Sequence, residues 1–398
     1  MPSADAGVLI AGAGPAGVAC ATTLRDEGFT GTIVLAGREP DPPYHRPPAS
    51  KAYLQGRRSR EDCLLHPADF WADRGIDLRT RTSVMKLDPA AGTAKLSTGE
   101  ELGFGAALIA TGANVRRLRV EGSALEGIHY LRALGNADAI RADAAGAERI
   151  VLVGGSYIAC EVAASLTAMG KACTLVMVEP LPLSTGFGPR VGEHVAGLLR
   201  AHGVELVTGD PLAAFTGDGC VQGVVTESGR VVDADLVVMG TGAVPDVMLA
   251  RSAGLALSEA GGVACDARLR TSAAGVWAAG DVCEYDSVVH GRRLRVEHWE
   301  VAAAQGAHAA RAMLGDEAPF AEVPYFWSDL ADWATIEAVG PAASWDAEIV
   351  RGSFNEGVFS VFYLDGPRLA AAMTIGRPED LDVARELMLS RADARSVL

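Results

Sequence analysis

The stretch VLIAGAGPAG at residues 8–17 decides the fold of this chain. Its first four residues are apolar, which is typical of a short strand buried on both faces. Gly12, Gly14 and Gly17 follow with G-x-G-x-x-G spacing. The first glycine permits a tight turn, the second lets a pyrophosphate approach the backbone, and the third lets helix and strand pack closely. A helix from Ala16 onward would then direct its free N–H groups at the phosphates.

A second stretch, RIVLVGGSYIA at residues 149–159, repeats this pattern. Gly154 opens the turn, but Ser156 stands at the second glycine position, where its Cβ would oppose a phosphate. The next predicted strand, 174–178, is followed by Glu179, at the distance expected for a carboxylate that binds ribose hydroxyls. Because such a carboxylate would repel a 2′-phosphate, the sequence favours NADH over NADPH. One glycine motif is weak support, but two predict a pair of dinucleotide-binding units, for which FAD and a nicotinamide are the usual ligands.

Three further apolar stretches end in turns of small residues. They are ALIATG at 107–112, VVMGTG at 237–242 and GVWAAGD at 275–281. The first two suit a chain that crosses between domains. The third would place Gly280 and Asp281 against the ribityl chain and pyrophosphate of FAD. The alternative for Asp281 is a helix N-cap.

Composition narrows the classes of function. A chain of 398 residues is long enough for two or three domains, and its net charge of −15 argues against nucleic acid or an anionic membrane as partner. Seven scattered cysteines without a CxxC pair indicate a reduced, cytoplasmic protein. Residues 6–24 carry no charge, but four glycines and Pro15 favour a strand, turn and helix over a membrane span. We predict no metal site.

Together these motifs resemble those of the FAD-dependent, NADH-using ferredoxin reductases that serve Rieske dioxygenases and bacterial cytochromes P450. That family is related to the rubredoxin reductases and to apoptosis-inducing factor. The similarity runs from residue 7 to about 380. It rests on GAGPAG at 12–17, YHRPPASKAYL at 44–54, ATG at 110–112, GGSYIACEVAASL at 154–166, LRTSAAGVWAAGDV at 269–282, EHWEVAAAQG at 297–306 and PYFWSD at 324–329.

The resemblance gives a role to Lys51, one of only four lysines, which follows the stiff Pro47-Pro48 corner. In relatives that reduce disulfides, the corresponding loop carries a redox cysteine beside the flavin. Here the resemblance implies a lysine near flavin N5 that pairs with Glu161 and stabilises negative charge on the reduced flavin. No thiol relay is then expected. The alternative for Lys51 is an exposed loop residue.

The resemblance also implies the remaining site residues. Arg46 should contact the FAD pyrophosphate or adenosine, and the helix that begins at His298-Trp299 should point its N-terminus at the flavin pyrimidine. His298 is more simply a capping or packing residue, and Trp327 is either close to the isoalloxazine or an ordinary core aromatic. The FAD set is Gly12, Gly14, Pro15, Ala16, Gly17, Glu39, Arg46, Lys51, Ala110, Thr111, Gly112, Gly280, Asp281, Glu297, His298, Trp299 and Trp327; the NADH set is Gly154, Gly155, Ser156, Tyr157, Ile158, Glu179 and Gly242; the catalytic set is Lys51, Glu161 and Trp327.

Four positions depart from the family pattern. Arg38 replaces the usual acid at the FAD ribose, so Glu39 must substitute for it. Ser156 is expected to weaken NADH binding. SDLADW at 328–333 lacks the usual Gln-Tyr, and TIGRPED at 374–380 keeps only the Arg-Pro of Asn-Arg-Pro. The last two concern the expected acceptor surface.

We therefore predict an α/β fold with two Rossmann-like dinucleotide-binding domains, similar to glutathione reductase, plus a C-terminal α+β domain. The FAD-binding domain should comprise 1–113 and 244–318, the NADH-binding domain 114–243 and the C-terminal interface domain 319–398. The chain should form a monomer or homodimer. It should pass electrons from NADH through FAD to a [2Fe–2S] ferredoxin, for which the arginine clusters at 57–60 and 292–295 are candidate docking ground. Alternatives are another acceptor, such as rubredoxin, a quinone or oxygen, or a slow NADH-binding redox switch.

Overall fold

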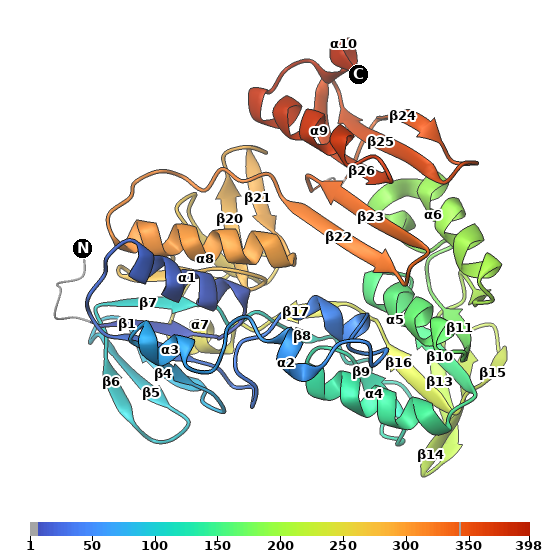
Figure 1. Cartoon of the computed structure of the whole chain (residues 1–398), viewed down its shortest axis with the longest axis horizontal. Helices are drawn as coiled ribbons and strands as arrows, with labels where there is room; N and C mark the ends of the chain where they lie inside the picture. Colours follow the sequence, from blue (N-terminus) through green and yellow to red (C-terminus); the bar gives the residue numbers. More distant parts are fainter. Residues whose placement is uncertain (1–6, 342–343) are drawn as a thin grey trace.

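The computed structural model describes residues 7–341 and 344–398. Two five-stranded parallel sheets form its two larger units, and a five-stranded antiparallel sheet forms the C-terminal part (Figure 1). The predicted fold class is confirmed. We call these the first, second and C-terminal sheets.

The first sheet has the order β19-β7-β1-β2-β3, and all of its pairings are parallel. Helices α1 and α8 pack together beside it (Figure 1). Gly306 allows this close packing, because a Cβ there would lie 2.0 Å from the Ala16 carbonyl oxygen. The elements are β1 (Val8–Ala11), α1 (Pro15–Asp26), β2 (Ile33–Ala36), β3 (Ile76–Arg79), β7 (Ala106–Ile109), β19 (Val276–Ala278) and α8 (Trp299–Met313).

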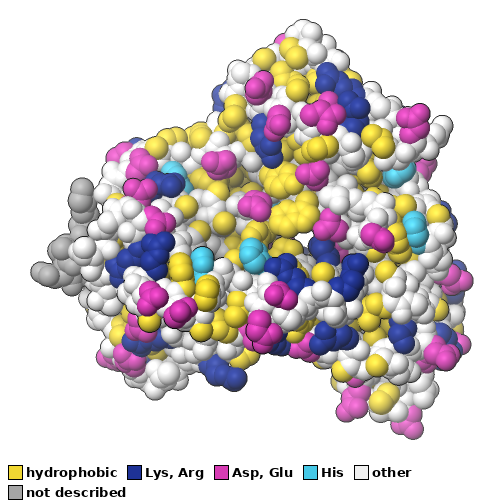
Figure 2. Space-filling model, viewed as in Figure 1, with side chains coloured by type: hydrophobic (Ala, Val, Ile, Leu, Met, Phe, Trp, Pro, Cys, Tyr) yellow, Lys and Arg dark blue, Asp and Glu magenta, His cyan; other side chains and the backbone are white. Residues whose placement is uncertain are grey.

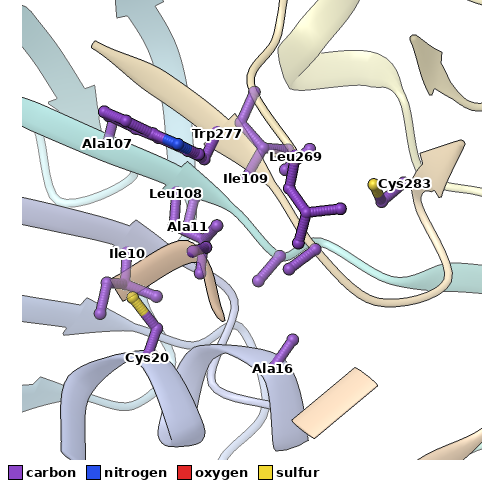
Figure 3. Packing of buried hydrophobic residues seen from close by; sticks show 14 of the residues in the cluster. Ile10, Ala11, Ala16, Cys20, Ala107, Leu108, Ile109, Leu269, Trp277 and Cys283 are labelled. Carbon is purple, nitrogen blue, oxygen red and sulfur yellow. The ribbon is translucent and has the colours of Figure 1, made fainter. Parts of the chain in front are cut away.

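The strands of the first sheet read as uninterrupted apolar runs because both of their faces are covered. Figure 3 shows Ile10 on β1 beside Cys20 on α1, and Ile109 on β7 close to Leu269 and Trp277 on the other side of the strands. This core fixes the strand ends that carry the first glycine motif.

The second sheet repeats the plan with the order β12-β11-β10-β16-β9, again all parallel. The predicted strand at 174–178 is displaced: β11 ends at Val176, and Val178 is 61% exposed. The elements are β9 (Ile128–Tyr130), α4 (Leu134–Gly146), β10 (Arg149–Val153), α5 (Tyr157–Ala168), β11 (Ala172–Val176), α6 (Ser184–Ala201), β12 (Glu205–Val207) and β16 (Leu236–Met239).

A two-stranded antiparallel ribbon joins the two larger units. It pairs β8 (Ala113–Val115) with β17 (Ala243–Pro245), so the chain leaves the first unit and returns to it at one place. The predicted domain division at 113/114 and 243/244 falls within this ribbon, and the division stays a prediction. Figure 1 shows the ribbon between the two units.

The C-terminal sheet has the order β22-β23-β26-β25-β24, with α9 against it. Helix α9 runs from Glu379 to Ser390 and gives the C-terminal part both helix and sheet, as an α+β domain requires. The sheet faces the second unit, where Tyr363 donates a hydrogen bond to the Phe187 carbonyl oxygen at 2.8 Å. The elements are β22 (Tyr325–Leu330), β23 (Ala334–Val339), β24 (Ala347–Ser353), β25 (Val358–Asp365), β26 (Arg368–Ile375), α9 (Glu379–Ser390) and α10 (Ala394–Val397).

The remaining elements form three small sheets and short helices. Among the described residues, no helix is both long and apolar enough to cross a membrane. The small sheets are β4 (Val84–Asp88), β5 (Thr93–Leu96) and β6 (Glu101–Gly103); β13 (Leu212–Asp218), β14 (Cys220–Thr226) and β15 (Val231–Asp233); and β18 (Val263–Cys265), β20 (Cys283–Ser287) and β21 (Arg292–Arg295). The short helices are η1 (Pro47–Ser50), a 3₁₀ turn, with α2 (Arg60–Cys63), α3 (Phe70–Asp73) and α7 (Met248–Ser252).

Candidate active site

One cavity of about 940 Å³ runs between the first unit, the second unit and the C-terminal sheet. In Figure 2 the molecule is hollowed at its centre, with yellow hydrophobic side chains above the hollow and dark blue Lys and Arg side chains below it. Both glycine turns reach this cavity, through Gly14 and Ser156. A volume of this size suits a long cofactor that lies against several elements.

The first glycine turn is built to receive a phosphate. Gly12 has a φ of +124°, and a Cβ on it would lie 2.0 Å from the Ala110 carbonyl oxygen. A Cβ on Gly17 would lie 1.9 Å from the Gly12 carbonyl oxygen, so helix and strand need both glycines to meet. A Cβ on Gly14 would meet only open space, and α1 begins just beyond it without a side-chain cap. The open space and the free helix N–H groups together fit the pyrophosphate of FAD.

The second turn repeats this geometry with one change. Gly154 has a φ of +122°, and a Cβ on it would lie 2.3 Å from the Gly240 carbonyl oxygen. Ser156 precedes α5 without capping it and lines the cavity. A Cβ on Gly155 would lie 2.8 Å from Oε2 of Glu179, so this carboxylate lies directly against the turn. Oε2 is buried without a hydrogen-bond partner among the described residues, and the predicted contact of Glu179 with the ribose hydroxyls stays a prediction.

Lys51 and Glu161 come together at the wall of the cavity. The Nζ atom of Lys51 lies 2.7 Å from Oε2 of Glu161, and both residues line the cavity. Glu161 is buried on α5, while Lys51 follows the 3₁₀ turn η1, where Pro47 and Pro48 fix the backbone. The predicted pairing of these two residues is therefore present in the structure.

The comparisons with known proteins fit this geometry. Residues 6–306 match the family model of pyridine nucleotide-disulphide oxidoreductases, and residues 325–397 match the model called reductase C-terminal. This chain belongs to the pyridine nucleotide-disulphide oxidoreductase family. It is thus a flavoprotein oxidoreductase, with FAD as cofactor and NADH as electron donor, as the sequence predicted.

Individual relatives narrow the comparison. Rhodocoxin reductase of Rhodococcus erythropolis is 34% identical over 382 residues, which cover 96% of this chain and 89% of the relative. The ferredoxin reductase for the CYP199A2 system of Rhodopseudomonas palustris has a TM-score of 0.94 at 31% identity, covering 98% and 96% of the two chains. The reductase in the covalent putidaredoxin reductase–putidaredoxin complex has a TM-score of 0.92 at 33% identity, covering 98% and 94%. The resemblance to ferredoxin reductases is confirmed.

In this oxidoreductase the residues around the predicted FAD ribose site are held by one another. Glu39 Oε1 lies 2.7 Å from Arg46 Nη2, and its other oxygen accepts from the Tyr44 hydroxyl. Burial alone would raise the pKa of Glu39, but Arg46 and Tyr44 lower it overall. Arg38 lines the same cavity, and its guanidinium lies 2.9 Å from the carboxylate of Asp246, which lines it too. Glu39 and Arg46 both line the cavity. Their predicted contact with FAD stays a prediction.

Sequence reasoning missed Arg132. It precedes α4 in the second unit, and its Nη2 lies 2.7 Å from Oδ2 of Asp281 in the first unit. Both residues line the cavity close to Gly112, where a Cβ would lie 3.5 Å from the same Nη2. An arginine beside the predicted pyrophosphate site could hold a phosphate directly. No local sequence motif indicates Arg132, because its contact with Asp281 forms only where the second unit packs against the first.

The α8 end of the cavity is aromatic. His298 is the N-cap residue of α8 but makes no capping bond with its side chain, and its Nδ1 is buried without a partner among the described residues. Burial lowers the pKa of His298 to about 4, against the opposing pull of Asp281, so its ring is neutral at pH 7. Trp299 and Trp327 line the same end, and the rings of Phe326 and Tyr157 lie 4.4 Å apart between α5 and β22.

The structure brings most predicted site residues to this single cavity. Four do not line it: Gly17 and Gly154 support the turns from behind, and Gly155 and Glu179 lie beside the second turn. Those that line it are Gly12, Gly14, Pro15, Ala16, Glu39, Arg46, Lys51, Ala110, Thr111, Gly112, Ser156, Tyr157, Ile158, Glu161, Gly242, Gly280, Asp281, Glu297, His298, Trp299 and Trp327.

Proposed function

We propose that this oxidoreductase passes electrons from NADH to a [2Fe–2S] ferredoxin that serves a cytochrome P450 or a Rieske oxygenase. When bound, FAD accepts a hydride from NADH and releases electrons to the acceptor. The observation that carries the proposal is the pairing of Lys51 with Glu161 at a cavity wall that holds no cysteine among the described lining residues. Its similarity to structures of ferredoxin reductases supports the choice of acceptor.

The cysteines closest to the glycine turns are unsuited to a thiol relay. Cys20 on α1 and Cys160 on α5 are fully buried in the cores behind those helices. Burial raises the pKa of both thiols well above the ordinary value, so neither forms the thiolate that attacks a disulfide. Lys51 takes the place where the disulfide-reducing relatives are expected to carry their redox cysteine.

The chain's own residues supply positive charge and neutral donors around the cofactor. Lys51 brings its ammonium group to the cavity, held there by Glu161. The N-terminus of α8 also faces the cavity, where it adds a partial positive charge behind a neutral His298. These groups stabilise negative charge near the flavin without any acid–base step of their own.

We infer that the ferredoxin docks on Arg57 and Arg58. Among the described residues, neither pairs with a carboxylate: Arg57 bonds to the Gln55 side chain, and Arg58 bonds to a backbone carbonyl oxygen. Arg58 also faces His45, whose ring lies 5.5 Å from that of Trp299 at the cavity. Burial first, and then Arg58, lowers the pKa of His45.

The second arginine cluster is less available for docking. On β21, Arg293 pairs with Asp286 at 2.9 Å, Arg295 pairs with Glu297, and Arg292 bonds to the Pro341 carbonyl oxygen. Exposed ion pairs cancel much of the field that would attract an acidic partner. The cytoplasmic location and the state of monomer or homodimer stay predictions from the sequence.

The experiment compares acceptors. We expect NADH oxidation to be fastest with a [2Fe–2S] ferredoxin, and slower with rubredoxin, a quinone, oxygen or a disulfide. Equal rates with ferredoxin and a simple redox dye would contradict the proposed acceptor. Very slow reduction of the flavin by NADH in stopped-flow mixing, with a long-lived charge-transfer band, would favour the redox switch instead.

A further inference from the structure

Glu161 is held at both of its carboxylate oxygens. Oε2 lies 2.7 Å from Nζ of Lys51 and accepts a hydrogen bond from the Ser50 hydroxyl. Oε1 accepts a hydrogen bond of 2.6 Å from the Ser328 hydroxyl. Ser50, Glu161 and Ser328 are 3%, 4% and 0% exposed, so water does not compete for these bonds.

These groups come from three parts of the chain. Ser50 ends η1 in the first unit, Glu161 lies on α5 in the second unit, and Ser328 lies on β22 of the C-terminal sheet. One helical turn beyond Glu161, Ser165 donates a hydrogen bond of 2.7 Å to the Ser50 carbonyl oxygen. Helix α5 therefore fixes the Lys51 loop, and Ser328 joins the C-terminal sheet to this junction by a hydrogen bond.

A buried carboxylate needs partners on both oxygens, because an ion pair alone does not offset its desolvation. Lys51 and Ser50 both lie at Oε2. Without Ser328, Oε1 would be left in the protein interior with no donor among the described residues. The carboxylate could then turn away from Lys51, whose side chain is only 16% exposed but can reach solvent.

We propose that Ser328 is a positioning residue that orients Glu161 and, through it, holds the ammonium group of Lys51 at the flavin. The inference rests on the proposed function only for the place of the flavin at Lys51. It gives the C-terminal sheet a part in tuning the cofactor, apart from any contact with the electron acceptor.

The test is a double-mutant cycle read as the two-electron midpoint potential of the bound FAD. Ser328→Ala should make the potential more negative and slow reduction by NADH. The expected size is on the order of a tenfold change in the redox equilibrium, as for the loss of one hydrogen bond to a charged group. In a Glu161→Gln background, Ser328→Ala should cause little further change. Ser328→Thr, which keeps the hydroxyl, should restore most of the wild-type potential.

Ser360→Ala is the matched control. Ser360 is also 0% exposed, lies in the same sheet, and donates a hydrogen bond of 2.8 Å to a carboxylate, that of Asp380. The Ser360→Ala variant should lower the unfolding temperature about as much as Ser328→Ala does, and it should leave the midpoint potential of FAD unchanged. An unchanged potential in Ser328→Ala, or a shift equally large in the Glu161→Gln background, would overturn the proposal. Neither result depends on which acceptor the wild-type enzyme prefers.

Discussion

Lys51 and Glu161 lie 110 positions apart in the chain and belong to different units, yet their charged atoms are 2.7 Å apart. The pair closes the cavity wall where the first and second units meet the C-terminal sheet. Its position makes the lysine the natural counter-charge for an anionic cofactor, while the glutamate keeps the lysine from extending into solvent.

Lys51→Met should make the FAD potential more negative and slow reduction by NADH about tenfold or more. If the loss of this positive charge removes about 1.4 kcal/mol of stabilisation from the reduced flavin, the midpoint potential falls by roughly 30 mV for a two-electron couple. Potentiometric titration and stopped-flow reduction measure the two effects. Lys86→Met is the control and should behave as wild type, because Lys86 is an exposed residue of β4 that does not line the cavity. Wild-type behaviour of Lys51→Met would make Lys51 an ordinary loop residue.

Gly14→Ala should weaken FAD binding at least tenfold without loss of fold stability. A Cβ at Gly14 enters open space at the cavity, whereas one at Gly12 would strike the Ala110 carbonyl oxygen at 2.0 Å. We therefore expect Gly12→Ala to lower the unfolding temperature as well. Gly197→Ala on α6, where a Cβ also meets nothing, should be harmless to FAD binding. Fluorescence titration of the apoprotein with FAD, together with thermal unfolding, separates these outcomes.

Glu179→Ala should narrow the preference for NADH over NADPH. Oε2 of this carboxylate is buried beside Gly155 and has no hydrogen-bond partner in the part of the chain that the structure describes. Its removal should take away both a ribose acceptor and the repulsion of a 2′-phosphate. The ratio of kcat/KM for the two cofactors is the measurement, with a change of about tenfold expected for a lost hydrogen bond to a charged group. Glu227→Ala, exposed in the same unit, is the control. An unchanged ratio would refute the assignment of Glu179 to the ribose.

Replacing Arg57 and Arg58 with glutamate should raise the KM for an acidic ferredoxin about tenfold or more and leave reduction of a small dye unaffected. The effect should shrink as salt concentration rises, because the attraction is screened. Arg230→Glu serves as control, because it reverses the charge of one exposed arginine that lies between β14 and β15 and does not line the cavity. If both charge reversals act alike, docking takes place elsewhere.

His290 should make the fold less stable at acidic pH. Burial, and then the charges of Arg292 and Arg391, lower its pKa to about 4, while an unfolded histidine titrates near 6.5. The unfolded chain thus binds more protons between these values, so stability falls as the pH drops from 6.5 toward 4. Urea unfolding midpoints at pH 7.5 and 5.0 should differ less in His290→Gln than in wild type. Equal differences would exclude this histidine as the source.

The glycine turns were predictable because their chemistry is local. Gly12 and Gly154 both need a positive φ and a close carbonyl neighbour, and such needs leave a fixed spacing in the sequence. Arg132 and Ser328 were not predictable by this route, since each acts on a residue more than 140 positions away. Glu39 lines the cavity, and its predicted contact with the FAD ribose stays a prediction. Its bonds to Tyr44 and Arg46 were not predictable, because they depend on how one loop folds back.

The displacement of the strand predicted at 174–178 also has a physical reason. The strand predicted to end at 178 stops at Val176, because the chain turns outward there to bring Glu179 back against Gly155. Strand β22 lacks a clean alternation of polar and apolar residues. Its Trp327 lines the cavity, and its Ser328 donates a hydrogen bond to the buried carboxylate of Glu161. Residues that serve a site break the pattern from which strands are recognised.

The ribbon of β8 and β17 has a consequence for engineering. Because Val115 pairs with Ala243, the segment between them begins and ends at adjacent points in space. A homologous segment from another reductase could be spliced in at these two residues as a cassette, without re-routing the host chain. A chimera of this kind should take its preference for NADH or NADPH from the donor segment, which offers a practical route to reductases with a changed electron donor.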